Sequence, residues 1–220
     1  MIIKITQTAS NIKQRFDVEL EGEYCQGEAG SFSELQDVTL TGKNGVLKAV
    51  FAPLELKKCF PNGKPPFKAV FTNPYIVYKD EKTLGSMVRA VRGIYKESYL
   101  LTTENSDFIH CYCRAKGAFN FVSIYAGDKQ IALMETYLAT HDCKYCHKLY
   151  LLDEYAHLSE LLSLFAVCYS STEFSKRFHM SMGTAAEKAW SFSRYNSKYD
   201  HKWREIHFPK ENYFGRILEK

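Results

Sequence analysis

The segment of residues 154–169, EYAHLSELLSLFAVCY, constrains the fold of this chain more than any other part of its sequence. Its spacing predicts a helix, and the preceding Asp153 is the predicted N-cap. A helix that is apolar on all sides must also be buried on all sides. At about 16 residues it is too short to cross a membrane, so we expect other parts of the chain to surround it. The apolar side chains that cover nearly all sides of this helix are Leu158, Leu161, Leu162, Leu164, Phe165, Ala166, Val167 and Tyr169.

The chain before this helix alternates between apolar and polar residues with the period of two that is typical of strands. The Gly-containing turns at residues 42–45 and 126–129 are hairpin signals. A content of 15 Tyr and 15 Phe suits the half-buried surface of a sheet. The predicted strands cover residues 3–6, 16–21, 37–41, 46–51, 67–71, 75–78, 86–92, 95–102, 108–113, 119–125, 130–137 and 145–152.

About a dozen strands with one encircled helix predict a mainly β (α+β) fold, a large antiparallel β-barrel that encloses one hydrophobic helix. A barrel of about eight strands is filled by its own side chains, whereas a wider one needs contents such as a central helix. Closure also removes the exposed edges that so many strands would otherwise present. We assign the barrel and its helix to residues 1–170, and a C-terminal extension to residues 171–220.

The stretches FNFVSIYAGDKQIALMETYL and KLYLLDEYAHLSELLSLFAVCYSS place a hairpin with a short Gly-Asp turn just before the helix. This order resembles the tubby C-terminal-like superfamily, which includes the LURP-one-related proteins and the phospholipid scramblases. The resemblance covers residues 1–170 by architecture and about fifty residues by local pattern. It implies a non-enzymatic binding or regulatory module, with an anionic lipid headgroup or a protein partner as the ligand. The segment after Tyr169 departs from the family, and no ligand residue carries over.

The extension of residues 171–220 differs in composition from the rest of the chain. It holds 10 Lys and Arg against 6 Asp and Glu, whereas residues 1–170 carry 19 of each, so the net charge of +4 lies entirely in the extension. Basic residues mixed with aromatic residues can bind nucleic acid or an anionic membrane surface. Ten aromatic side chains are nevertheless too many to leave exposed. We therefore expect Trp190 and Trp203 to dock the extension on the barrel or on a second copy, as a homo-oligomer, and we do not expect nucleic acid as a partner.

Cysteine and histidine residues form the sharpest motif, HDCKYCH at residues 141–147. Its Cys-x-x-Cys-His spacing matches covalent haem attachment, but that reaction needs export, and MIIKITQTASNIKQ has no apolar core for a signal peptide. A zinc site is the alternative, with His110 and His141 as further candidate ligands. The competing interpretation is that Cys111 and Cys113 fill one strand face, in which case no cofactor is expected. The predicted zinc ligands are Cys111, Cys113, Cys143, Cys146 and His147.

A Pro-rich loop at residues 57–66 concentrates lysine and cannot be a central strand. At one end of a barrel, its positive charge could hold a phosphate group, whereas the alternative is a solvated loop. The candidate phosphate-binding residues are Lys57, Lys58, Lys64 and Lys68.

Sequence motifs for catalysis are missing. The chain has no Gly-x-Ser-x-Gly elbow, no Gly-x-x-x-x-Gly-Lys-Ser/Thr loop and no Gly-x-Gly-x-x-Gly, so the sequence favours a protein that is not an enzyme. We predict that His157 is a hydrogen-bonded core residue. The seven cysteines of a chain without a secretion signal are expected to be reduced thiols, which indicates a cytoplasmic protein. No stretch approaches the roughly 20 apolar residues of a transmembrane segment.

Overall fold

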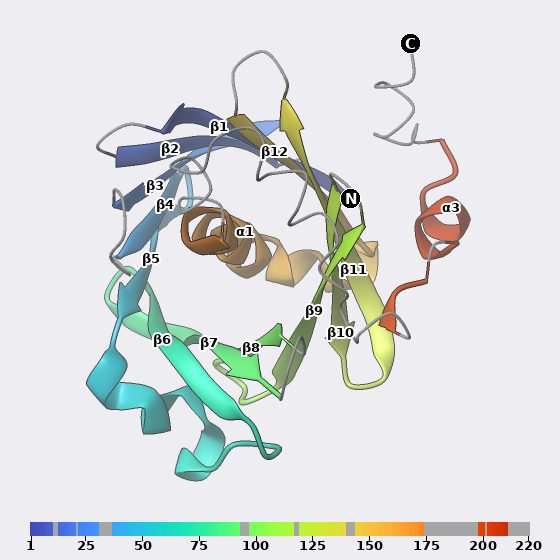
Figure 1. The fold of residues 1–220 in the computed structure, drawn as a ribbon. Coiled ribbons are helices and arrows are strands. Elements are labelled where there is room, and N and C mark those ends of the chain that lie inside the picture. The colour runs from blue at the N-terminus through green and yellow to red at the C-terminus, as the bar shows by residue number, and fades with distance from the viewer. Residues whose placement is uncertain are drawn as a thin grey trace, which may run out of the picture.

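The computed structural model describes residues 1–10, 13–20, 22–30, 37–92, 97–116, 119–139, 144–173, 198–200 and 202–210. Twelve strands close into a single barrel in the order β1-β12-β11-β10-β9-β8-β7-β6-β5-β4-β3-β2, and every neighbouring pair is antiparallel (Figure 1). The strands are β1 (Ile2–Ser10), β2 (Lys13–Leu20), β3 (Glu23–Gly30), β4 (Val38–Gly42), β5 (Gly45–Phe51), β6 (Val70–Lys79), β7 (Lys82–Val91), β8 (Glu97–Thr103), β9 (Phe108–Lys116), β10 (Phe119–Ala126), β11 (Lys129–Ala139) and β12 (Lys144–Leu151).

The central helix enters the barrel directly after β12. A 3-10 segment, η3 (Asp153–Leu158), leads into the α-helix α1 (Ser159–Glu173), which Figure 1 shows inside the ring of strands. Leu162, Leu164 and Ala166 are fully buried. Gly27 of β3 allows the helix to approach the barrel wall closely, because a Cβ at this position would lie 3.0 Å from a methyl group of Val167. The prediction of a barrel of about twelve strands around one hydrophobic helix is therefore confirmed.

The start of the helix differs from the prediction. The cap position is Leu152, which makes no side-chain cap bond, and Asp153 is the first residue of η3. The Asp153 carboxylate instead forms an ion pair with the amino group of Met1. The N-cap prediction for Asp153 is therefore wrong, because the first turn is a 3-10 turn that begins one residue earlier.

Inward-facing side chains of the strands and the helix make one apolar core. Several polar side chains inside the barrel are paired. Gln7 donates to Gln14 at 3.3 Å, and the Thr136 hydroxyl lies 2.8 Å from Nδ1 of His147. Pairing is required there because a buried polar group without a partner is destabilising.

Two further apolar clusters lie on the outside of the barrel wall. The 3-10 segments η1 (Pro53–Cys59) and η2 (Pro61–Gly63) place Cys59 and Phe60 over Ile76, Val88 and Leu100. The Cys59 carbonyl accepts hydrogen bonds from the hydroxyls of Ser86 (3.0 Å) and Thr102 (3.1 Å). These contacts fix the loop between β5 and β6 against the wall.

The second outer cluster joins the C-terminal part of the chain to the wall. A short helix, α3 (Trp203–His207), brings Trp203 against Phe121, Leu133 and Tyr150, and only 7% of the Trp203 surface is exposed. Of the extension, the structure describes residues 171–173, which end α1, and residues 198–200 and 202–210, from which Tyr199, Trp203 and Phe208 pack here. Trp190 lies outside the described residues. Within the described part of the chain, no helix is both long enough and apolar enough to cross a membrane.

Candidate functional site

The predicted zinc ligands that the structure describes lie on strands that are far apart around the barrel. Cys111 and Cys113 face the interior from β9 and belong to the central core. Cys146 and His147 lie on β12, and two strands, β10 and β11, separate β9 from β12. At the usual spacing of strands this separation is about 14 Å along the sheet, which is too far for shared coordination of one zinc ion.

Cys146 and His147 are also consecutive strand residues, so their side chains point to opposite faces of the sheet. His147 is buried inside the barrel, whereas Cys146 is partly exposed. Cys143 and His141 lie outside the described residues. Among the residues that the structure does describe, no three His, Cys, Asp or Glu side chains are grouped to hold a metal ion. The described members of the proposed zinc site are therefore not brought together, and Cys111 and Cys113 fill one strand face.

His147 instead titrates as a buried residue of the core. Burial lowers the pKa of its imidazole to about 3, so the ring stays neutral and keeps its contact with the Thr136 hydroxyl. In the unfolded chain the same imidazole takes up a proton below its ordinary pKa of 6.5. His147 therefore contributes stability that is present above pH 6.5 and is lost as the pH falls towards 3.

We expect the His147→Gln variant to show a flatter dependence of stability on pH than the parent protein. Between pH 7 and pH 5, the difference in the free energy of unfolding that is due to His147 should be about 2 kcal/mol. Chemical denaturation at both pH values measures it. The matched control is His157→Gln, since His157 is exposed. Parallel pH curves for the parent and His147→Gln would contradict the assignment.

The four candidate phosphate-binding lysines are exposed on the outside of the barrel. Lys57 and Lys58 belong to η1, whereas Lys64 and Lys68 follow η2. Lys58 forms an ion pair with Glu55 at 2.6 Å. The loop therefore lies on the wall, and these lysines do not line the pocket described next.

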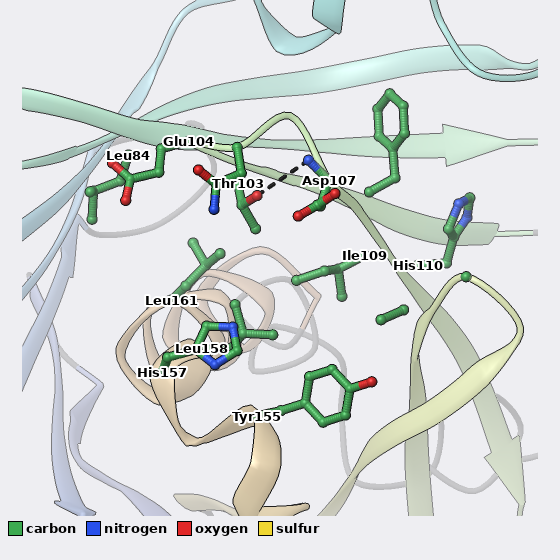
Figure 2. Close-up of a pocket in the computed structure, with 14 residues that line it drawn as sticks. Leu84, Thr103, Glu104, Asp107, Ile109, His110, Tyr155, His157, Leu158 and Leu161 are labelled. Atoms are coloured by element: carbon green, nitrogen blue, oxygen red, sulfur yellow. Dashed lines mark hydrogen bonds between the residues drawn. The ribbon is translucent and has the colours of Figure 1, made fainter.

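A pocket of about 570 Å³ opens where the helix enters the barrel. We call it the rim pocket. Four parts of the chain form it: Leu84 of β7, the turn between β8 and β9 with the start of β9, the tip of the β10–β11 hairpin, and η3 with the first turn of α1 (Figure 2). Its volume lies within the range of about 300–1,000 Å³ that is usual for small-molecule sites. Its apolar lining includes Leu84, Ile109, Leu158 and Leu161, and its polar lining includes Thr103, Glu104, Asn105, Asp107, Tyr155 and His157.

The two sides of the rim pocket differ in chemistry. Figure 2 shows Glu104 and Asp107 on the turn above, across from Tyr155 and His157 on the helix side. Leu158 and Leu161 are almost fully buried and form an apolar floor. The exposed carboxylates and imidazole stand at the mouth. The pocket thus offers an apolar surface below and hydrogen-bonding or charged groups above.

The charges at the mouth do not all balance. Glu104 is paired with Lys82 at 3.0 Å, and Glu154, beside Tyr155, is paired with Lys129 at 2.6 Å. The Asp107 carboxylate makes no ion pair with any residue in the described ranges. The Asp107 backbone bonds locally: its NH donates to the Thr103 hydroxyl, and its carbonyl accepts from the Thr103 NH at 3.1 Å. The mouth therefore carries one uncompensated negative charge.

The prediction that His157 is a core residue is wrong. Its side chain is exposed at the mouth of the rim pocket, with its ring centroid 6.3 Å from that of Tyr155. The prediction assumed a regular α-helix from Glu154, whereas η3 has 3-10 geometry and a kink at Tyr155. This geometry places His157 on a different side of the helix axis.

Comparison with known proteins gives no match to any family model, to any curated protein or to any solved structure. The resemblance to the tubby C-terminal-like superfamily thus gains no support from these comparisons, and a relation to that family stays a hypothesis.

Proposed function

We propose that the protein is a non-enzymatic binding module whose rim pocket takes a small ligand with an apolar body and one positively charged group. The supporting observation is that Leu158 and Leu161 form an apolar floor, while the Asp107 carboxylate stands at the mouth without an ion pair in the described ranges. Pockets of this kind bury the apolar part of a ligand, and a few polar groups fix its orientation. An ammonium group would compensate the charge of Asp107 and leave the pairs of Glu104 and Glu154 intact.

The polar groups at the mouth favour recognition over a reaction. The Thr103 hydroxyl accepts a hydrogen bond from the backbone of Asp107, at 3.3 Å, so it serves to shape the turn. His157 lies beside Tyr155, and the aromatic ring of Tyr155 already attracts one cation, since Lys129 Nζ lies 5.5 Å from its centroid. An aromatic ring and a carboxylate near one another suit a bound ammonium group.

The hypothesis of an anionic lipid headgroup at Lys57, Lys58, Lys64 and Lys68 concerns a separate surface. These lysines lie on the outer wall, whereas the rim pocket has acidic residues at its mouth. An anionic ligand is therefore not the one that we propose for the pocket.

Two probes with the same apolar body and opposite charge test this proposal: 4-phenylbutylamine and 4-phenylbutyrate. We expect the amine to bind more tightly, as measured by calorimetric titration. Asp107→Asn should weaken amine binding about fivefold, because a partly exposed ion pair contributes about 1 kcal/mol.

The matched control is Asp128→Asn, an exposed carboxylate on the same rim that does not line the pocket. This variant should bind the amine as the parent protein does. The proposal fails if the two probes bind equally, if neither of them binds, or if Asp107→Asn leaves the affinity for the amine unchanged.

A further inference from the structure

A second surface, on the outer wall of the barrel, combines aromatic rings with cations. It runs across the outward side of β9 and the neighbouring part of β10, between the loop after η2 and the segment at residues 198–200. His110 also lines the rim pocket, but its imidazole belongs to this outer surface, where it stacks near Tyr112. We call this surface the aromatic–basic band. Its members are Phe67, Arg92, His110, Tyr112, Arg114, Tyr125, Lys198 and Tyr199.

Direct ring contacts connect the band from one end to the other. The ring centroid of His110 lies 5.6 Å from that of Phe67 and 5.9 Å from that of Tyr112. Tyr112 in turn meets Tyr125 edge to face at 5.6 Å. The Tyr125 hydroxyl donates to the carbonyl of Lys198 at 3.1 Å. The rings are therefore held in place by one another and by the wall.

Three cations lie over the faces of these rings. The Arg92 guanidinium carbon is 3.5 Å from the centroid of Phe67, and that of Arg114 is 4.5 Å from Tyr199. Lys198 Nζ lies 5.1 Å from Tyr125 and 5.6 Å from Tyr112. Burial and the positive charges of Arg92 and Lys198 lower the pKa of His110, so this imidazole is neutral in the middle of the band.

The cations of the band differ from several others on the wall, which have a carboxylate partner. Lys4, Arg15 and Lys48 each form an ion pair with an acidic residue on a neighbouring segment. Within the described ranges, Arg92, Arg114 and Lys198 form none. In addition, Nε of Arg114 is buried and has no hydrogen-bond partner there.

One carboxylate, Asp200, stands at the edge of the band and acts on Tyr125, whose pKa is raised by burial and by this charge. It accepts a hydrogen bond from the backbone NH of Lys202 at 2.8 Å. None of the three cations forms an ion pair with Asp200 or with any other carboxylate in the described ranges, so their charge is largely uncompensated. The band therefore has a net positive charge on a rigid support.

We propose that the aromatic–basic band binds an extended acidic peptide segment of a partner protein. The guanidinium groups of Arg92 and Arg114 lie over rings. The edge of the exposed Arg92 stays open to a carboxylate, which a guanidinium can bind through two parallel hydrogen bonds. The cations stand in a line along several rings rather than around one point, which fits a chain with repeated carboxylates.

Two other anionic partners fit the band less well. Single-stranded nucleic acid binds by stacking bases on free aromatic faces, but the protein's own cations lie over the faces of Phe67, Tyr112, Tyr125 and Tyr199. A membrane surface favours exposed apolar side chains that can insert. The large apolar side chains that are exposed in the described ranges, Tyr24, Val46, Leu54, Val70 and Ile206, are not members of the band.

Fluorescence anisotropy with a labelled ten-residue peptide of alternating Glu and Ser tests the proposal, and the same peptide with Gln in place of Glu is the uncharged probe. We expect only the Glu peptide to bind, and binding to weaken as salt is raised from 50 to 200 mM, since surface charges are screened. Arg92→Gln and Arg114→Gln should each lower the affinity at least fivefold. Arg92 is exposed, so its replacement should leave the packing of the barrel wall unchanged.

The matched control is Arg15→Gln, which removes an arginine from β2, on another part of the barrel. It should bind the Glu peptide as the parent protein does. Equal losses in Arg15→Gln and Arg92→Gln would indicate a general charge effect and overturn the proposal. It is also overturned if the Glu peptide does not bind, or if a ten-nucleotide oligothymidylate or vesicles with 30% phosphatidylserine bind more tightly than the peptide does.

Discussion

Leu162→Asp should abolish cooperative folding of the barrel. Leu162 is fully buried near the start of α1, and the barrel wall surrounds it. A carboxylate at that position would have no partner, and burying an unpaired charge opposes folding by several kcal/mol. The whole free energy of unfolding of a domain is about 5–15 kcal/mol. Thermal and urea denaturation followed by circular dichroism should show no cooperative transition.

A graded variant and a matched control separate this effect from a general effect of the substitution. Leu162→Ala should remain folded and lose about 2–5 kcal/mol of stability, the usual range for a Leu-to-Ala change in a core. Leu54→Asp makes the same chemical change at a residue of η1 that is 99% exposed, and it should leave the melting temperature unchanged. A Leu162→Asp protein that melts as the parent does would contradict the role of α1 as the filling of the barrel.

The barrel could be predicted from the sequence because the signals for it are local. Alternation along most strands, the turn at Gly127 with φ +58°, and the apolar circumference of residues 154–169 all lie within short stretches of chain. The strand β3 was not predicted. The number of strands and the need to bury the helix then left few architectures. Closure followed from these two requirements together.

The rim pocket could not be predicted because its parts come from distant segments. Leu84, Asp107 and Leu158 meet only after β7, β8 and η3 have taken their places in the barrel. No short motif marks such a site. Leu158 and Leu161 were predicted as part of the apolar helix and His110 as a candidate zinc ligand, but neither signal indicated a pocket. His157 had a signal of its own, since it is a polar residue at the start of an apolar helix. The 3-10 geometry of η3, which the pattern did not reveal, decides that it faces solvent.

The predicted zinc ligands form a clear pattern in the sequence, but the fold separates those that the structure describes. Adjacent residues on a strand point to opposite faces, so Cys146 and His147 cannot serve one site while both lie on β12. The opposite orientation of these two side chains follows from the sequence alone. The separation of Cys111 from His147 does not, because it depends on the order of strands around the barrel.

The contact of the C-terminal segment with the wall combines apolar burial with a buried ion pair. Arg204 Nε lies 3.6 Å from a carboxylate oxygen of Glu135, and both side chains are 6% exposed. Burial nevertheless raises the pKa of Glu135, against the attraction of Arg204, a hydrogen bond from Tyr150 and the charge of Lys148. Desolvation therefore outweighs the attraction, as is common for buried pairs. We infer that Trp203, rather than the ion pair, supplies most of the free energy that holds this segment.

Trp203→Ala should accordingly destabilise the protein by about 3 kcal/mol, within the range for removal of a large buried aromatic side chain. The indole packs against Phe121, Leu133 and Tyr150, with its ring centroid 5.9 Å from that of Phe208, so its removal leaves a cavity on the wall. The matched control is Ile206→Ala, on the same short helix but 66% exposed, which should change stability by less than about 0.5 kcal/mol. Urea denaturation measures both variants. Equal stability of the parent and Trp203→Ala would mean that the segment contributes nothing to the barrel, and its aromatic residues would then be free to bind a partner.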